Sequence, residues 1–269
     1  MSIILKPGVN EGLSNAQYHS EKLHLSSSNL KTLLKSPAQF YDEKILGNSK
    51  PMSGAALDIG SYVHTLILEP ELVAQEYVQF DGWRRQGKVY EDFKAQHPGK
   101  TVLSQPQMNA GQMLARSVQA CPPAVHLLKG GAAELSLASE ILGVPVKMRA
   151  DYINPDAGYI LDVKTTRWPS GADTFRRTVK ELGYELSAAL YCEIAYRVYG
   201  KIFDFYWLVV SKTDVETQVY KASTHSLSDG SALVNKALVA YKKCLETGVW
   251  PDTLEQISSA VGDFEILEI

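Results

Sequence analysis

The chain has 269 residues with 45% hydrophobic and 21% charged side chains, which is the composition of an ordinary folded globular protein. Its apolar runs are too short to cross a bilayer and its N-terminus lacks a secretion-signal pattern, so we expect a cytoplasmic protein without a membrane partner. Three widely spaced cysteines argue against a disulfide framework and against a four-cysteine metal or iron–sulfur site. With a net charge of −3, local basic patches would have to hold any nucleic-acid partner.

The N-terminal part of the chain predicts helices after a polar lead-in. Residues up to about Tyr18 are polar and contain glycine, and they predict an extended arm. A helix follows with Ser28 as its N-cap, and Pro37 ends it or opens the next helix. Lys31 and Lys35 lie on one side of this helix. They are candidates for DNA contact, although lysines on a solvated helix face give the same pattern.

The apolar run ALDIGSYVHTLILEPEL predicts a buried helix in which His64 is the polar exception. A lone histidine on such a helix is more often a core residue than a ligand, so the helix alone assigns it no function. The next stretch, FDGWRRQGKVYEDFKAQHPGKTVL, interleaves basic and aromatic side chains between glycines. Arg84, Arg85 and Lys88 in this stretch could hold a phosphate backbone, and a surface loop with a helix explains them equally well.

Three successive strands are predicted in ELSLASEILGVPVKMRADYINPDAGYILDVKTT, which begins at Glu134. Alternation places Asp162 and Lys164 on one face of the last strand, and it groups Asp151 with two basic residues on one face of the middle strand. The turn at residues 154–158 joins these two strands as a hairpin. We therefore expect Asp151 to lie beside Asp162.

The remainder of the chain predicts a helix, two strands and a last helix. KIFDFYWLVVSK is continuously apolar, as expected for a central strand, and VETQVYKAS predicts a neighbouring strand. Ser226 or Ser228 caps the last helix, and Gly248 ends it. The economical interpretation is one α/β domain with a mainly helical part at residues 1–130, a β-sheet catalytic core at 131–250 and an acidic tail at 251–269.

Carboxylates that converge without cysteines are hard oxygen ligands, which favours Mg²⁺ or Mn²⁺ over zinc. Facing carboxylates also repel one another, so the cluster makes sense mainly around a divalent cation. Lys164 could orient a water or stabilise negative charge during phosphodiester hydrolysis, and the Val163 carbonyl could be a further metal ligand. For a bare D-x-K pattern, the alternative is a surface hairpin with an Asp–Lys salt bridge.

The segments LDIGSYVH, AAELSLAS, VKMRADYI and YILDVKTT follow one another in this order. In order and spacing they resemble the PD-(D/E)xK nuclease superfamily, and most closely its RecE-type exonuclease branch (exodeoxyribonuclease VIII-like). The segments SSSNLKTLLKSPAQFY, RRQGK and GVWP extend the resemblance over most of the chain. The resemblance implies an α/β fold with a central mixed sheet flanked by helices and with additional N-terminal helices.

The resemblance assigns a catalytic role to each residue of the cluster. His64 corresponds to a histidine beside the metal, and Asp151 and Asp162 correspond to metal-binding acids. Lys164 corresponds to the catalytic lysine, and Glu134 to an upstream acid that could hold a second ion or its waters. Two Mg²⁺ ions are expected, with Mn²⁺ as the alternative metal.

The resemblance also extends to the helix after the D-x-K motif. Relatives of this branch place a glutamine four residues before a tyrosine there, and in this chain the two positions are Ser187 and Tyr191. Both are candidates for DNA contact. Serine is too short to reach as far as glutamine, so the contact of this helix with the metal site or with DNA is an open question.

The activity implied by the resemblance is processive 5′-to-3′ digestion of one strand of linear double-stranded DNA. The remaining 3′ single strand would pass to an annealing protein in phage-type recombination, and relatives look like ring-shaped homo-oligomers, either trimers or tetramers. One alternative is a sequence-specific or Cas4-like nuclease, although the absence of a cysteine cluster disfavours the iron–sulfur kind. Another is a catalytically retired nuclease fold that binds DNA or a recombination partner.

Overall fold

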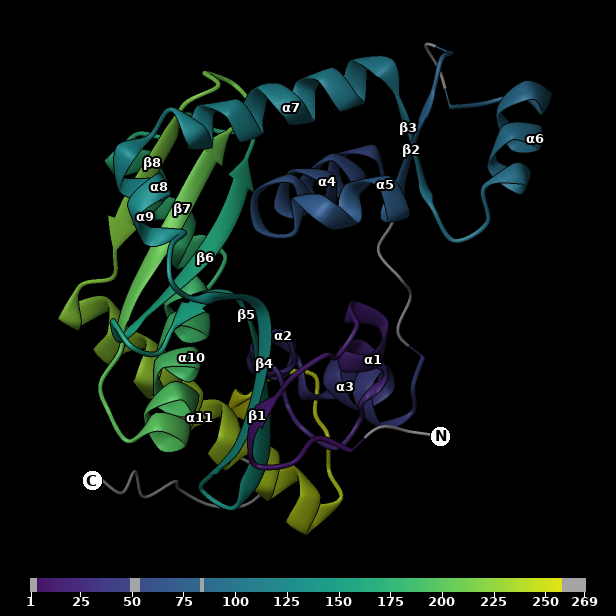
Figure 1. The fold of residues 1–269 in the computed structure, drawn as a ribbon. Helices are drawn as coiled ribbons and strands as arrows, with labels where there is room; N and C mark the ends of the chain where they lie inside the picture. Colours follow the sequence, from purple (N-terminus) through teal and green to yellow (C-terminus); the bar gives the residue numbers. More distant parts are fainter. Residues whose placement is uncertain (1–3, 49–53, 83–84, 258–269) are drawn as a thin grey trace.

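A six-stranded mixed sheet forms the centre of the computed structural model, which describes residues 4–48, 54–82 and 85–257 (Figure 1). Strands β6 and β7 are parallel, and the other neighbouring strands are antiparallel. This confirms the predicted α/β class, and the continuously apolar strand β7 is internal as expected. The strands lie in the order β1 (Gly8–Asn10), β4 (Ala132–Ile141), β5 (Val144–Asn154), β6 (Tyr159–Thr166), β7 (Asp204–Ser211) and β8 (Thr217–Lys221).

Helices cover both faces of the sheet. One face packs against a buried cluster that includes Val63, Leu114 and Ala124, contributed by three helices. These helices are α4 (Ala55–Leu68), α7 (Gln105–Gln119) and α8 (Pro122–Leu127). The opposite face packs against α2 (Ser27–Lys35), α9 (Ala172–Glu181), α10 (Tyr184–Tyr199) and α11 (Thr224–Thr247). None of the helices in the described part of the chain is both long and apolar enough to cross a membrane.

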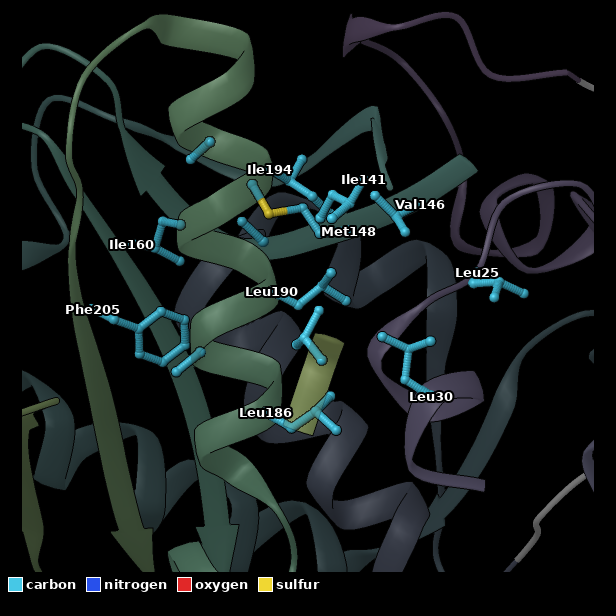
Figure 2. Close-up of a cluster of buried hydrophobic side chains, with 14 of the residues drawn as sticks. Leu25, Leu30, Ile141, Val146, Met148, Ile160, Leu186, Leu190, Ile194 and Phe205 are labelled. Atoms are coloured by element: carbon cyan, nitrogen blue, oxygen red, sulfur yellow. The ribbon is translucent and has the colours of Figure 1, made fainter. Parts of the chain in front are cut away.

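The larger core lies between α10 and the sheet (Figure 2). Leu186, Leu190 and Ile194 recur on one side of α10 at helical spacing, and Figure 2 shows them in one cluster with strand residues such as Met148 and Phe205. Leu30 of α2 joins the same cluster. This packing fixes α2 and α10 against β5 and β6, the two strands that carry the acids of the predicted site.

The N-terminal segment differs from its prediction. An extended arm was predicted, and part of the segment is extended as β1, which pairs antiparallel with β4, but the short helix α1 (Asn15–Ser20) follows it. Helix α2 starts two residues earlier than predicted, because Ser26 and not Ser28 accepts the backbone N–H of Asn29 as N-cap. Pro37 opens the next helix, α3 (Pro37–Phe40), and a π-helical turn (Tyr41–Ile45) follows.

A second, two-stranded parallel sheet was not predicted. It pairs β2 (Tyr77–Phe80) with β3 (Thr101–Ser104), and α6 (Lys88–Gln96) connects them. Figure 1 shows this unit projecting beside α4 and away from the six-stranded sheet, and a turn at Pro70–Leu72 and α5 (Val73–Glu76) lead into it. Each strand has four residues, which is too short for period-two alternation to mark it clearly.

Two turns occur where the sequence predicted them. Residues 155–158 connect β5 to β6 as a hairpin, with Gly158 at φ +73. Gly248 ends α11 in the left-handed conformation, at φ +71. The predicted start of α11 was wrong, because Ser223, not Ser226 or Ser228, caps the helix by accepting the Ser226 backbone N–H.

Candidate active site

The candidate site lies at a fork between β5 and β6. The two strands pair from Asn154↔Tyr159 to Tyr152↔Leu161, and the next positions, Asp151 and Asp162, are not paired. In place of a ladder bond, Asp151 Oδ2 accepts the backbone N–H of Val163 at 2.7 Å. The carboxylate of Asp151 is therefore held in the opening between the two strands.

The ladder between β4 and β5 is interrupted at the same level. Ala133 pairs with Tyr152 and Leu135 pairs with Ala150, while Glu134 and Asp151 between them are unpaired. Glu134 has φ 51, a left-handed conformation that is uncommon for a residue with a side chain. Such local strain is found where surrounding contacts fix a side chain in a special direction. Here it directs Glu134 toward the fork.

Three ligand-type side chains converge at this fork. One donor atom each from His64, Glu134 and Asp151 lies within 4.8 Å of the others. His64 reaches the fork from α4, where its Nδ1 lies 3.7 Å from Asp151 Oδ2 and its ring hydrogen-bonds to the backbone of Val163. Glu134 is held by Arg149, whose Nε donates to Glu134 Oε2 at 2.5 Å and whose Nη1 donates to the Leu13 carbonyl at 2.7 Å.

Asp162 and Lys164 lie beside this group on β6. Lys164 Nζ is 2.5 Å from Asp162 Oδ2, so the two charges form a close, largely buried pair. The Lys164 ammonium also lies 5.1 Å from the ring centroid of Tyr184, at the start of α10. Lys31 of α2 approaches the same ring at 5.3 Å, so two cations flank Tyr184.

The ionisable groups of the site interact strongly, and burial and neighbouring charges shift their pKa values. Burial, and then the neighbouring charge of Asp162, raises the pKa of Asp151 to about 7. Burial and the nearby Asp151 also raise the pKa of Glu134. Burial and the positive charge of Lys164 lower the pKa of His64 and favour its neutral, metal-binding form. Burial alone would lower the pKa of Lys164, but Asp162 and Asp151 outweigh it and raise the pKa.

The donor set fits a divalent cation. It offers carboxylate oxygens of Glu134 and Asp151 and a neutral imidazole, with the carboxylate of Asp162 beside them. Hard cations such as Mg²⁺ and Mn²⁺ prefer such oxygen ligands, and their charge would offset the repulsion among the acids. The residues that would hold the ion are His64, Glu134, Asp151 and Asp162.

The structure brings five predicted site residues to one place: His64, Glu134, Asp151, Asp162 and Lys164. They come from four elements, α4, β4, β5 and β6. Asp151 lies beside Asp162 as the hairpin predicted, because the strand register ends one step before them. The backbone of Val163 is part of the site, through its N–H to Asp151 and its hydrogen bond with His64.

The residues predicted to bind DNA are dispersed. Lys31 lies near Lys164 through Tyr184, and Lys35 is exposed one helical turn further along α2. Arg85 pairs with Asp58 at 2.5 Å and donates to the Val102 carbonyl at 3.0 Å, between α4 and the small sheet. Lys88 is exposed at the start of α6, and Arg84 lies outside the described residues.

The two predicted contact residues on α10 face the protein interior. The side chain of Ser187 is buried, at 9% exposed. Tyr191 packs beside Phe205 with 6.3 Å between ring centroids and hydrogen-bonds to Ser27, and burial raises its pKa well above the usual value. A contact of either residue with DNA stays a prediction.

Two residues of the site had no predicted role. Arg149 anchors Glu134, and the ring of Tyr184 lies near the ammonium groups of both Lys31 and Lys164. Alternation did place Arg149 on the same face of its strand as Asp151, which was a usable signal. Tyr184 gave none, because its position depends on how the start of α10 packs against β6.

Comparison with known proteins agrees with this geometry. The family described as a PDDEXK-like domain of unknown function (DUF3799) matches residues 26–261. A solved structure named "Putative exonuclease", from Eubacterium rectale, superposes with a TM-score of 0.68 at 16% identity, over 97% of this chain and 96% of that one. A second, SSO0001, covers 78% of this chain and 98% of its own at 14% identity, and its TM-score of 0.31 carries no argument. No curated protein matches the sequence.

The family match spans the helix that carries Lys31, the fork between β5 and β6, and helix α11. The likeness to the exonuclease-named structure is one of fold, since the sequence identity is low. Together with the mixed sheet and the D-x-K strand at the fork, these findings identify the chain as a member of the PDDEXK-like family, with the fold of the PD-(D/E)xK nuclease superfamily.

Proposed function

We propose that this protein is a metal-dependent DNA nuclease of the RecE exonuclease type. The observation that carries the proposal is the fork itself, where donor atoms of His64, Glu134 and Asp151 lie within 4.8 Å of one another beside the Asp162–Lys164 pair. A surface hairpin with a salt bridge would not recruit a histidine from a separate helix or bury a second aspartate beside the first, with its pKa raised to about 7.

Each group at the fork has a separate role in the proposed hydrolysis. Bound Mg²⁺ would polarise the scissile phosphate and lower the pKa of a bound water. Asp151 and Asp162 would hold the ion between the strands, and Arg149 keeps the carboxylate of Glu134 turned toward it. Lys164 is placed to donate to the attacking water or to a phosphate oxygen, where it stabilises the negative charge that develops in the transition state.

Lys31 is the best placed of the predicted DNA contacts. It is half-buried near Lys164, and no carboxylate pairs with it in the described part of the chain. Burial, and then the charge of Lys164, lower its pKa to about 8. We propose that Lys31 binds a DNA phosphate next to the scissile one, because a phosphate would neutralise both lysines.

The finer features of the proposed activity come from the RecE resemblance. They are digestion of linear duplex DNA from 5′ to 3′, processivity, a ring-shaped homo-oligomer and delivery of the 3′ strand to an annealing protein, in a cytoplasmic phage or prophage setting. The name of the Eubacterium rectale structure is in keeping with an exonuclease. Two Mg²⁺ ions, or Mn²⁺ ions in their place, are proposed as cofactors.

One assay tests the proposal directly. Purified protein is mixed with linear duplexes labelled separately at each 5′ and 3′ end, and with a covalently closed circle, in Mg²⁺, Mn²⁺ or EDTA. The proposal expects loss of the 5′ label first, an intact circle and no reaction in EDTA. Cutting of the circle would replace the exonuclease with an endonuclease.

The retired-nuclease alternative makes a different prediction in the same assay. Such a protein binds the duplex without cleaving it in either metal. The burial of Ser187 is compatible with it, since the glutamine found at this position in relatives is absent. The complete set of acids and the lysine at the fork favours the active enzyme, because buried carboxylates without a use are costly to retain.

A further inference from the structure

The loop and helix that directly follow β6 expose one aromatic side chain and three arginines. Trp168 is 49% exposed, and the Arg167 guanidinium lies 4.8 Å from its ring centroid. Arg176 and Arg177 are exposed on the first two turns of α9. The acidic residue among positions 167–177 is Asp173, so the segment is positively charged in a chain whose net charge is −3.

The exposed indole stands on a loop that the rest of the fold holds in place. Four hydrogen bonds fix the backbone of residues 166–170 against the turn after β7 and against β8. They are Lys212 N–H to Thr166 O at 2.8 Å, Thr213 Oγ1 to Arg167 O at 2.6 Å, Ser170 N–H to Asp214 Oδ2 at 3.2 Å, and Tyr220 Oη to Ser170 O at 2.5 Å. Exposure of Trp168 is thus a property of a well-fixed loop and not of a loose tip.

The chain connects this surface closely to the candidate active site. Trp168 follows Lys164 by four residues at the end of β6, a span on the order of 13 Å in an extended chain. Helix α9 leads directly to Tyr184, and its Phe175 lies 6.3 Å from the Tyr184 ring. Because helix side chains lean toward the N-terminus, the arginines of α9 lean toward the Trp168 loop.

The chemistry of the surface suits an unpaired nucleic-acid strand. An exposed indole stacks on the face of any base, and the base faces are free only in a single strand. Arginines bind phosphates in bidentate geometry. The Arg176–Asp173 pair at 2.7 Å is fully at the surface, where such pairs contribute little and can exchange for a phosphate contact.

We infer that Arg167, Trp168, Arg176 and Arg177 form a binding surface for single-stranded DNA beside the metal site. The inference rests on the proposed nuclease function, since it deepens that function by naming where an unpaired strand runs. Trp168 stacks on a base, Arg167 supports the indole, and the two α9 arginines contact phosphates. The competing occupants are the backbone of duplex DNA and a partner protein.

Binding is measured by anisotropy of a fluorescein-labelled 20-nucleotide single strand and of its duplex, in EDTA so that no cleavage occurs. Trp168→Ala is expected to weaken single-strand affinity between about fivefold and 150-fold, and Trp168→Phe by less. Arg176→Gln/Arg177→Gln is expected to lower the slope of log affinity against log salt by about 1.4. Tryptophan fluorescence of the wild type should be quenched by the single strand more than that of Trp168→Phe.

Matched controls sit elsewhere on the surface. Ile202→Ala removes a side chain that is 86% exposed at the opposite end of the parallel strands. Lys236→Gln/Lys242→Gln removes the same charge as the arginine pair from an exposed part of α11. Both controls should bind single strands like the wild type, and all variants should keep the wild-type melting temperature.

The outcomes separate this inference from the proposed function. Unchanged single-strand affinity in both test variants, or no single-strand binding by the wild type, overturns the inference even if the nuclease is active. Equal losses for single strand and duplex assign the surface to duplex backbone and also overturn it. A selective loss of single-strand binding supports the inference even if no metal makes the protein cleave DNA.

Discussion

Strand β5 carries two buried charge clusters that differ in how their charges are balanced. At Lys147 the ammonium is 3.1 Å from Glu21 Oε2, and it donates to the carbonyls of Tyr18 at 2.6 Å and Glu21 at 2.9 Å. Four residues later, Asp151 faces Glu134 and Asp162, and its pKa is raised to about 7 by burial and by Asp162. The first cluster is satisfied by the chain itself, and the second is not.

The comparison of the two clusters distinguishes charges that stabilise the fold from charges that are candidates for a function. Glu21 also accepts the backbone N–H of Leu23 at 2.8 Å and contacts His24 Nδ1 at 3.1 Å. Both members of the Lys147–Glu21 pair therefore have several hydrogen-bond partners. Such a network joins the N-terminal segment to the sheet. At the fork, burial and the neighbouring carboxylates raise the pKa values of Asp151 and Glu134, so these acids are close together without full compensation, as in a site that suits a divalent cation.

The largest expected effect is on catalysis at the fork. Lys164→Ala should lower the rate of Mg²⁺-dependent DNA cleavage by about 10² to 10⁴-fold, because the cation that stabilises developing charge is lost. DNA affinity in EDTA should change little. Single-turnover cleavage of an end-labelled duplex gives the rate.

The matched control is Lys221→Ala, which removes an exposed lysine that pairs with Asp204 at 2.8 Å on the same sheet. It should cleave DNA at the wild-type rate. Wild-type turnover in Lys164→Ala would remove this lysine from the mechanism and would weaken the contrast between the two clusters.

The next effect is on stability at the other cluster. Lys147→Met leaves Glu21 as an uncompensated buried charge and should lower the free energy of unfolding by about 3–5 kcal/mol. At a few degrees per kcal/mol, the melting temperature should fall on the order of 10 °C. Differential scanning calorimetry measures both quantities.

The double variant Glu21→Gln/Lys147→Met sharpens this test, because it removes both charges and keeps an acceptor for the backbone of Leu23. It should recover a large part of the lost stability. If the double variant is less stable than Lys147→Met alone, the two residues do not act as a charge pair.

A smaller effect is expected on metal binding. Asp151→Asn removes the carboxylate at the centre of the fork and should weaken Mn²⁺ or Mg²⁺ affinity at least about tenfold, since even groups that only orient metal ligands commonly change affinity by this factor. Isothermal titration calorimetry compares it with Asp156→Asn, an exposed residue of the same hairpin. Equal affinity in all three proteins would place the ion elsewhere.

The smallest effect is a pH dependence of stability from Glu21. Burial alone would raise its pKa, but hydrogen bonds from His24 and Lys147 outweigh burial and lower the pKa below the usual 4.5. Its stabilising contribution is therefore complete above pH 4.5 and is lost as the pH falls through the lowered value. The melting-temperature difference between wild type and Glu21→Gln should narrow below about pH 4.5. A gap that is constant from pH 7 to 3.5 would contradict this.

The sequence alone determined a large part of this result. Apolar periodicity and turn residues located α4, the β5–β6 hairpin and the internal strand β7, because each of these elements is long or ends at a glycine with positive φ. The single helix predicted after the D-x-K strand is in the structure two helices, α9 and α10, because Gly183 between them is left-handed. The order of the motifs around His64, Asp151 and the D-x-K strand identified the superfamily to which the chain belongs. Local patterns suffice for such features, since the residues that specify them are close together in the chain.

Other features depended on contacts between distant segments. The edge strand β1 and the small β2–β3 sheet are too short to be marked by their own sequence, and pairing partners more than a hundred residues away hold β1 in place. The burial of Ser187 and the position of Tyr184 depend on how α10 packs against β5 and β6. The same holds for the pairing of Arg85 with Asp58.

The candidate site shows most clearly which features the sequence predicts and which depend on tertiary contacts. Alternation predicted which residues share a face of β5, but at Asp151 the alternation changes phase, since Ala150 packs in the core beneath α10 and Tyr152 packs in the core beneath α7. That change goes with the break in pairing at Glu134 and Asp151 and with the fork at Asp162. The sequence by itself determined which side chains are candidates for the site. Only the tertiary structure decided that they meet, because the meeting requires strands to separate, and a period of two describes strands that stay paired.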